Sequence, residues 1–343
     1  MSRLLSDLGV DIPVLAAPMA GGGSTSALVT AAARAGGLGF LAAGYKTPEM
    51  LAEQIRTVRE QAVPFGVNVF APNPVPVSED AFRRYAARMR SEADRYGLSL
   101  PDSAPVEDDD HWTAKIDLLL ATPVPWVSFT FGIPDPAVIA SLRRSGTTVM
   151  QSVTSVDEAR RAEEAGVDAL IVQGTAAGGH SATLDPDRPL SALTLPQLVS
   201  AVRRTTNLPL IAAGGIGTSL DVAAALRAGA EAAMIGTLLL RTEESGASAP
   251  HKQALADPAF DTAVLTRAFT GRPARALRNS FIDRHEDDAP AGYPAVHHLT
   301  APLRKAATAA GDHERIHLWA GTGYRRAVEE PTARTLRRLT AAL

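Results

Sequence analysis

The chain has 343 residues, of which 45% are hydrophobic and 21% are charged, a composition typical of a globular protein with a large core. The formal net charge of -3, without any dense cluster of Lys and Arg, argues against nucleic-acid binding. There is no cysteine, which excludes disulfides, thiolate metal sites, iron–sulfur clusters and cysteine nucleophiles, so redox chemistry needs a bound cofactor.

The first thirteen residues contain Asp7 and Asp11 and lack the basic start and long apolar segment of a secretory signal. No apolar run reaches the roughly 18 residues that suggest a membrane span. These features predict a cytoplasmic protein without a membrane segment.

Short apolar runs that suit buried strands recur up to residue 240, and most precede a segment with the pattern of an amphipathic helix. Ser24 or Thr25 can cap the first helix, and Thr47 with Pro48 suits the start of the second. The eight expected strands cover residues 14–17, 38–42, 65–70, 126–130, 147–151, 168–173, 208–212 and 230–235.

The alternation breaks once, after the third strand. A proline-rich stretch leads into a charged helix over residues 78–96 and then into an acidic loop. We interpret residues 72–113 as a surface excursion, and we expect the next helix of the repeat to start near His111.

Alternating strands and helices demand a mainly parallel sheet, either closed into a barrel or open and doubly wound. Eight repeats in about 240 residues match the size of an α/β (β/α)₈ TIM barrel. An open sheet would normally carry Gly-x-Gly-x-x-Gly after its first strand, and Gly21-Gly22-Gly23 lacks that spacing, so the barrel is preferred.

After residue 243 the strand–helix rhythm is lost. We therefore expect a barrel domain over residues 1–243, a smaller substrate or lid subdomain over residues 244–312, and a C-terminal segment, residues 313–343, that returns to the barrel.

The sixth expected strand leads into a loop of small residues that ends at His180. Small residues let a ligand approach the backbone, and this loop would lie at the end of the barrel where barrel enzymes keep their chemistry. With an ordinary pKa of roughly 6.5, a histidine there can accept a proton near neutral pH. A loop of this kind also occurs without a catalytic role, so both interpretations stay open.

Glycine-rich loops follow the seventh and eighth expected strands. Their backbone N–H groups and the helix N-terminus behind them can form an anion site without a lysine, although the glycines could also serve only close helix packing. The candidate phosphate-binding residues are Gly214, Gly215, Met234, Ile235, Gly236 and Thr237.

Asn68 and Gln173 stand at strand ends, where an amide can pair with a planar heterocycle or simply cap a turn, and Gln151 is a weaker case. Pro18-Met19-Ala20 would supply a backbone wall, although a Met beside a strand end is more often core. The remaining histidines lack ligand spacing, so no metal site is expected.

The motifs APMAGG at residues 17–22, Asn68, QGTAAGGH at 173–180, AGGI at 213–216 and GT at 236–237 together resemble the nitronate monooxygenase family, formerly called 2-nitropropane dioxygenases. The resemblance covers nearly the whole chain. Residues 268–275 and 318–323 are similar to the AFSGRPAR and LWAGQG segments of that family.

The resemblance implies a barrel that binds FMN non-covalently, with the phosphate at Gly215 and residues 234–237. With the candidates above, the expected cofactor site comprises Pro18, Met19, Ala20, Asn68, Gln151, Gln173, Gly178, Gly179, Gly214, Gly215, Met234, Ile235, Gly236 and Thr237.

In that picture His180 faces the flavin, either as the base that removes the α-proton of a nitroalkane or as the group that binds a nitronate anion. The small-molecule substrate and O₂ would give a carbonyl compound and nitrite. The chain departs from the family pattern at Ser181-Ala182, where Arg-Gly is common, and at Thr322, where Gln is common. The first departure bears on the substrate entrance and the second on the flavin edge.

Three alternatives stay open. An NADH-dependent quinone reductase and a flavin-dependent enoyl-thioester reductase would share the scaffold and need a nicotinamide nucleotide. No separate dinucleotide fingerprint is visible that would decide between these reductases and a monooxygenase. The third is a protein that binds flavin without turnover. A homodimer is also left open.

Overall fold

Eight parallel strands close into a barrel, so the predicted TIM barrel is confirmed and the open sheet is excluded. The computed structural model describes residue 5, residues 10–100 and residues 104–343; part of the N-terminal stretch and part of the predicted excursion lie outside the described residues. The barrel strands, in order around the barrel, are β1 (Val14–Ala16), β2 (Leu38–Ala42), β3 (Phe65–Ala71), β4 (Trp126–Phe131), β5 (Thr148–Val153), β6 (Ala169–Gln173), β8 (Leu210–Ala213) and β9 (Ala232–Ile235).

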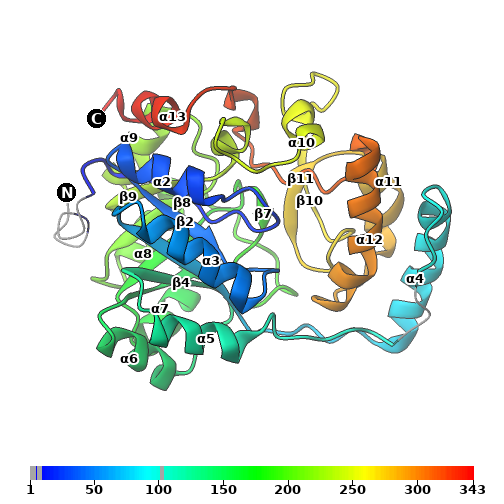
Figure 1. Cartoon of the computed structure of the whole chain (residues 1–343), viewed down its shortest axis with the longest axis horizontal. Helices are drawn as coiled ribbons and strands as arrows, with labels where there is room; N and C mark the ends of the chain where they lie inside the picture. The colour runs from blue at the N-terminus through cyan, green and yellow to red at the C-terminus, as the bar shows by residue number, and fades with distance from the viewer. Residues whose placement is uncertain (1–4, 6–9, 101–103) are drawn as a thin grey trace.

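Helices cover the outside of the barrel, as Figure 1 shows. Their starts follow the local signals: the Thr47 hydroxyl accepts from the N–H of Met50 with Pro48 next to it, and the Asp135 carboxylate accepts from the N–H of Ala137. The covering helices are α2 (Ser26–Arg34), α3 (Pro48–Arg59), α5 (Trp112–Ala121), α6 (Pro136–Arg144), α7 (Val156–Glu164), α8 (Leu195–Arg203), α9 (Ser219–Arg227) and the C-terminal α13 (Thr332–Thr340), which packs on α2 and α9.

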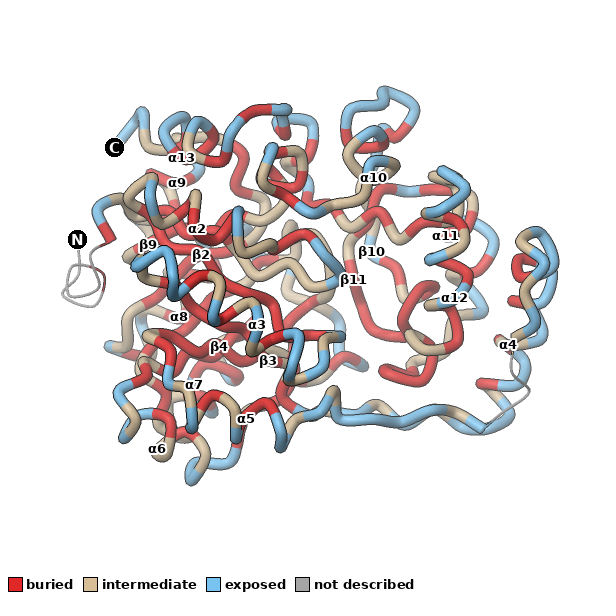
Figure 2. Tube along the Cα trace, in the orientation of Figure 1, coloured by how far each residue is buried: buried red, intermediate tan, exposed pale blue. Residues whose placement is uncertain are grey.

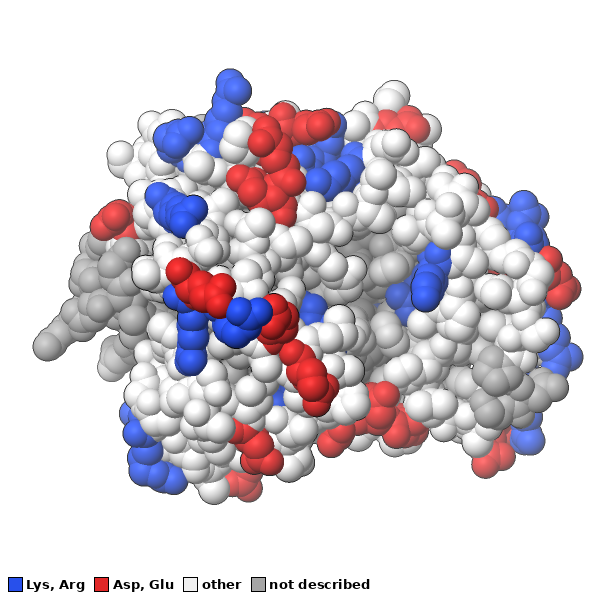
Figure 3. All heavy atoms as spheres, in the orientation of Figure 1, with Lys and Arg blue, Asp and Glu red and all other residues white. Residues whose placement is uncertain are grey.

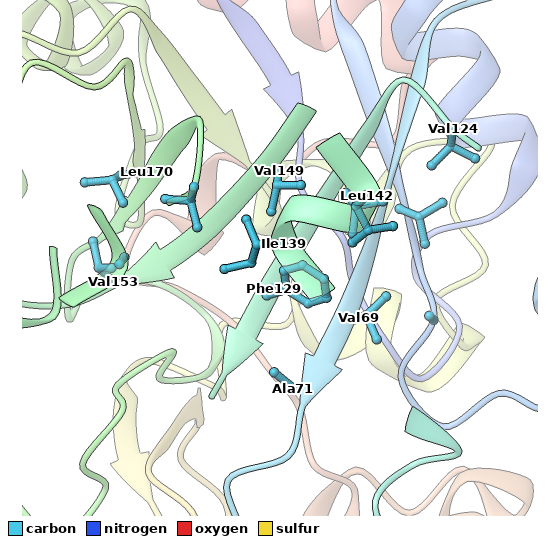
Figure 4. Close-up of a cluster of buried hydrophobic side chains, with 14 of the residues drawn as sticks. Val69, Ala71, Val124, Phe129, Ile139, Leu142, Val149, Val153 and Leu170 are labelled. Carbon is cyan, nitrogen blue, oxygen red and sulfur yellow. The ribbon is translucent and has the colours of Figure 1, made fainter. Parts of the chain in front are cut away.

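The pleat of each strand divides the core into two layers, because successive side chains point to opposite faces. Phe40, Trp126 and Met150 pack inside the barrel. The outer layer lies between strands and helices; Figure 4 shows Phe129 and Val149 from the strands beside Ile139 and Leu142 of α6. Burial in Figure 2 is accordingly concentrated along the strands and the inner faces of the helices.

A second, antiparallel sheet stands beside the barrel, in the order β10 (Ala263–Thr266), β11 (Ala274–Leu277), β7 (Gly179–His180). The loop expected before His180 thus ends in a two-residue strand that pairs with β11. Around this sheet lie α10 (Ala249–Ala254), α11 (Ser280–His285), α12 (Ala295–Ala310) and short 3₁₀ helices at Glu286–Asp288, His313–Arg315 and Tyr324–Arg326; another 3₁₀ helix, Thr237–Arg241, follows β9.

The chain between β3 and α5 leaves the barrel and carries α4 (Glu79–Asp94) to the far edge of the molecule, where α4 packs against α12 (Figure 1). Figure 3 shows acidic and basic side chains scattered together over one face, and a hollow between the barrel and the part that holds α12. Within the described ranges, no helix is long and apolar enough to cross a bilayer.

One buried carboxylate of α4 binds residues of α11 and of the 3₁₀ helix at His313–Arg315. Glu92 is 5% exposed, and its two oxygens accept hydrogen bonds from Arg284 at 3.0 Å, His285 at 3.0 Å and Arg315 at 2.7 Å. Burial alone would raise the pKa of Glu92, but the hydrogen bonds from His285 and Arg315 and the charge of Arg284 together hold it below the usual 4.5.

We expect Glu92→Gln to lower the free energy of unfolding by about 3 kcal/mol, because Arg284 and Arg315 lose their buried negative charge and one acceptor oxygen becomes an NH₂ donor. The contribution of Glu92 is fully present above its unfolded pKa and is lost as pH falls through its lowered folded pKa, so the loss of stability below about pH 4.5 should be shallower in the variant. Urea titrations at neutral and acidic pH check this. Glu53→Gln, in an exposed pair with Arg56, is the control and should change little.

Candidate active site

A cavity of about 340 Å³ opens at the carboxyl ends of the barrel strands, a size suited to a small ligand. It brings together all but one of the predicted site residues. The predicted residues on its wall are Pro18, Met19, Ala20, Asn68, Gln173, Gly178, Gly179, His180, Gly214, Gly215, Met234, Ile235, Gly236 and Thr237.

Gln151 is the exception, because it does not line the cavity. Its side chain is fully buried and shares the outer face of β5 with Val149 and Val153, where it donates from Nε2 to the carbonyl of Ser152 at 3.1 Å. Ser152, one residue further along the strand, lines the cavity instead. A single step along a strand reverses the direction of the side chain, and the apolar run alone did not reveal which residue faced inward.

His180 is held between the two sheets of the molecule. Its backbone pairs with Ala274 of β11, and its Nε2 lies 2.9 Å from Oγ1 of Thr270. Its ring lies 5.7 Å from the rings of Phe131 and Tyr293 and 5.3 Å from that of Trp319, measured between centroids. Nδ1 has no hydrogen-bond partner among the described residues, so this nitrogen is available to a ligand.

The surroundings of His180 disfavour its protonated form. Burial, followed by the positive charges of Arg272 and Arg304, lowers its pKa from 6.5 to about 3. The ordinary histidine pKa of 6.5 therefore does not apply to His180. His180 is a neutral imidazole across the physiological range, able to donate from one ring nitrogen and to accept at the other.

The two amides at the barrel mouth are arranged differently. Gln173 uses both ends of its amide within its own loop: Nε2 donates to the carbonyl of His180 at 3.2 Å, and Oε1 accepts from the N–H of Ala182 at 2.8 Å. Asn68 donates from Nδ2 to Ser128 and Thr130, and no described residue donates to its Oδ1. Gln173 thus positions the loop of His180, whereas Asn68 offers an acceptor to a ligand.

Three glycine-bearing segments meet on the opposite wall. Gly214 and Gly215 have φ of 106° and 74°, and a Cβ on Gly215 would lie 2.6 Å from the Cβ of Ala176. The N–H of Gly321 donates to Oγ1 of Thr237 at 2.9 Å, so the Thr237 hydroxyl keeps its proton for another acceptor. The wall brings backbone amides close together without a bulky side chain, as an anion such as a phosphate requires.

Known proteins resemble this chain over nearly its whole length. The family model described as nitronate monooxygenase matches residues 2–340. The chain belongs to the nitronate monooxygenase family. It is 35% identical over 335 residues to a probable nitronate monooxygenase from Staphylococcus aureus (strain Newman), covering 96% of this chain and 94% of that relative.

Solved structures of two other proteins are similar to this chain over nearly its whole length. A nitroalkane oxidase from Streptomyces ansochromogenes has 48% sequence identity and a TM-score of 0.92, covering 99% of this chain and 97% of that one. FabK from Thermotoga maritima has 28% identity and a TM-score of 0.76, covering 99% and 94%. The suspected resemblance is confirmed, and membership of the nitronate monooxygenase family makes the protein a flavin-dependent oxidoreductase.

Several aromatic residues on the cavity wall had only a weak signal in the sequence. Tyr45 has a φ of 65°, lines the cavity and stacks on His297 at 4.2 Å, and the Tyr293 hydroxyl donates to the Tyr45 hydroxyl at 3.3 Å. Phe131 ends β4 with a φ of 82°. The hints were a tyrosine three residues after the second strand and a phenylalanine at the end of the fourth, and aromatic residues at such places are common in cores.

The two departures from the family pattern lie at different parts of the site. Ala182 lines the cavity next to Gln173, whereas Ser181 is buried and donates its N–H to the carbonyl of Pro273. Thr322 donates its N–H to the carbonyl of Ala176, beside the glycine wall. Within the described ranges, no group of three or more His, Asp or Glu residues could hold a metal ion.

Proposed function

We propose that this protein oxidises nitronates or nitroalkanes with O₂, using FMN bound at the barrel mouth, and yields a carbonyl compound and nitrite. The observation that carries the proposal is a neutral His180 facing a ligand-sized cavity, with two buried arginines near enough to depress its pKa. Such a pocket suits a small ligand with negative charge on oxygen.

The residues on the wall fit FMN. The glycine segments at Gly215, Gly236 and Gly321 suit a phosphate, and barrel enzymes frequently bind phosphate in the loops after the seventh and eighth strands. Oδ1 of Asn68 can accept from a ring N–H of a flavin. A bound flavin would supply the redox chemistry between the substrate and O₂ that no side chain of the site can supply.

The chain itself has three tasks in this proposal. His180 hydrogen-bonds to an oxygen of the substrate or accepts its α-proton at Nδ1, while Gln173 holds the loop of His180 in place. The rings of Phe131 and Trp319 exclude water from the space beside the imidazole. Because a pKa of about 3 makes His180 a weak base, binding of a preformed nitronate is favoured over proton removal from a neutral nitroalkane.

We further propose that residues 244–312 act as the substrate-facing part. Thr270 and Tyr293, which contact His180, both come from this segment. The barrel would then hold the cofactor, and the segment would shape the space for the substrate.

The deciding experiment is anaerobic reduction of the flavin in the purified protein by propyl-1-nitronate or by NADH. Rapid bleaching by the nitronate supports the proposal. Reduction by NADH with indifference to nitronates would move the protein to the reductases, and a protein that cannot be loaded with FMN would contradict both.

The pH dependence of kcat/KM gives a second prediction. Because burial and two arginines lower the pKa of His180 to about 3, this group does not titrate between about pH 5 and 8. The profile for a preformed nitronate should be flat over that interval. A steep change near pH 6.5, absent from a His180→Gln variant, would show that the imidazole titrates normally.

A further inference from the structure

A buried arginine with no carboxylate beside it among the described residues lies behind the Phe131 ring. Arg272 is 0% exposed, and its Nη2 donates to the carbonyl of Thr183. No described residue accepts a hydrogen bond from Nε or Nη1, and no described carboxylate lies within 4.0 Å of the guanidinium. A positive charge buried in this way is costly unless something offsets it.

Phe131 separates this charge from the catalytic space. The guanidinium carbon of Arg272 lies 4.1 Å from the centroid of the Phe131 ring, and that ring lies 5.7 Å from the ring of His180. Phe131 holds an unfavourable φ of 82°, and Nδ2 of Asn73 donates to its carbonyl at 2.9 Å. The backbone is therefore held in a rare conformation that places the ring between the cation and the cavity.

The other charged and titratable groups around His180 do not cancel the positive field. Arg304 is a second buried cation, while burial keeps Tyr293, His297 and His317 neutral by raising the pKa of the tyrosine and lowering those of the histidines. The carboxylate that acts electrostatically on Arg272 is Glu158. Its oxygens already accept hydrogen bonds from Thr154, Thr183 and the N–H of Leu184.

We propose that Arg272 makes the pocket selective for the anionic form of the substrate, the nitronate, over the neutral nitroalkane. This inference rests on the proposed function. Arg272 lies behind Phe131 and off the cavity wall, so it is a positioning residue that acts electrostatically on the substrate and on His180. The negative charge of the bound substrate offsets the charge that the fold leaves unpaired.

The test compares Arg272→Met, which removes the charge, with Arg272→Lys, which keeps it. Kinetics with propyl-1-nitronate and with 1-nitropropane report on charged and neutral substrates, and calorimetry with inorganic nitrate reports planar-anion binding without turnover. Arg278→Met is the matched control, since Arg278 is 60% exposed and paired with Asp283. Arg272→Gln replaces the Met variant if that variant does not fold.

We expect Arg272→Met to weaken nitrate binding and to raise KM for the nitronate by about tenfold or more, with KM for 1-nitropropane changed by less than about threefold. Arg272→Lys should recover most of the loss. Removing the charge should also raise the pKa of His180 and move any acid limb of the pH profile upward, which a packing role would not do.

Equal effects on both substrates in Arg272→Met, with unchanged nitrate affinity, would overturn the inference and leave Arg272 a packing role. If the wild-type protein oxidises neither substrate, the proposed function fails. Nitrate affinity would then still decide whether Arg272 creates an anion-binding pocket.

Discussion

Replacing His180 with alanine should lower the rate of flavin reduction by a nitronate by about 10²–10³-fold while the flavin stays bound. The imidazole is the polar side chain held over the cavity by Thr270, and its loss removes the hydrogen bond to the nitronate oxygen. The fold should persist, because β7 is joined to β11 through the backbone of His180. Stopped-flow absorbance under anaerobic conditions measures the rate.

His180→Gln separates polarity from proton transfer, since glutamine can donate a hydrogen bond but does not titrate. With 1-nitropropane as the substrate, a rate in the glutamine variant well above that of the alanine variant would favour anion binding over base catalysis. His313→Gln is the control, because this histidine packs beside Phe260 and does not line the cavity. A rate in His180→Ala within about threefold of wild type would contradict the role proposed for His180.

Replacing Gly215 with alanine should weaken FMN binding at least about a hundredfold. The residue has a φ of 74°, which an L-residue rarely adopts, and the new Cβ would lie 2.6 Å from the Cβ of Ala176 in the facing loop. Relief of that contact would push apart the two loops that form the proposed phosphate site. Flavin fluorescence during dialysis and reloading measures the affinity.

Gly146→Ala provides the matched control. Gly146 has a φ of 89°, yet a Cβ there would meet nothing within 4 Å, so the variant carries the backbone strain without the clash. It should lose some stability and keep its flavin. Wild-type flavin content in Gly215→Ala would show that the glycine wall does not hold the cofactor.

Much of the barrel could be predicted because its signals are local. β2 occupies the expected residues 38–42, Thr47 caps the helix that follows it, and α5 begins one residue after His111. A capping side chain accepts a hydrogen bond from a backbone N–H within three residues of itself, and a buried strand is a continuous apolar run. Both signals therefore come from residues that are neighbours in the sequence. α8 and α12 went unpredicted, because no strand directly preceded them in a clear repeat.

The site was only partly predictable, for a related reason. The glycine loops and His180 follow directly from strand ends, where position in a barrel already implies proximity to the cavity. The sequence did not reveal which of Gln151 and Ser152 points toward the cavity, because the direction of a strand side chain depends on the register with the neighbouring strands. The lowered pKa of His180 could not be predicted either, since it depends on burial and on the charges of Arg272 and Arg304 from another part of the chain.

The sequence by itself determined the order of the eight barrel strands, the family, and the small set of loops that line the cavity. The tertiary structure alone decided that β7 joins a second sheet, that Arg272 lies behind Phe131 with no described carboxylate beside it, and that Tyr45 meets Tyr293. These contacts join residues far apart in the chain. Their energies depend on distance in space and on exclusion of water, and neither quantity is encoded in the local pattern of residues.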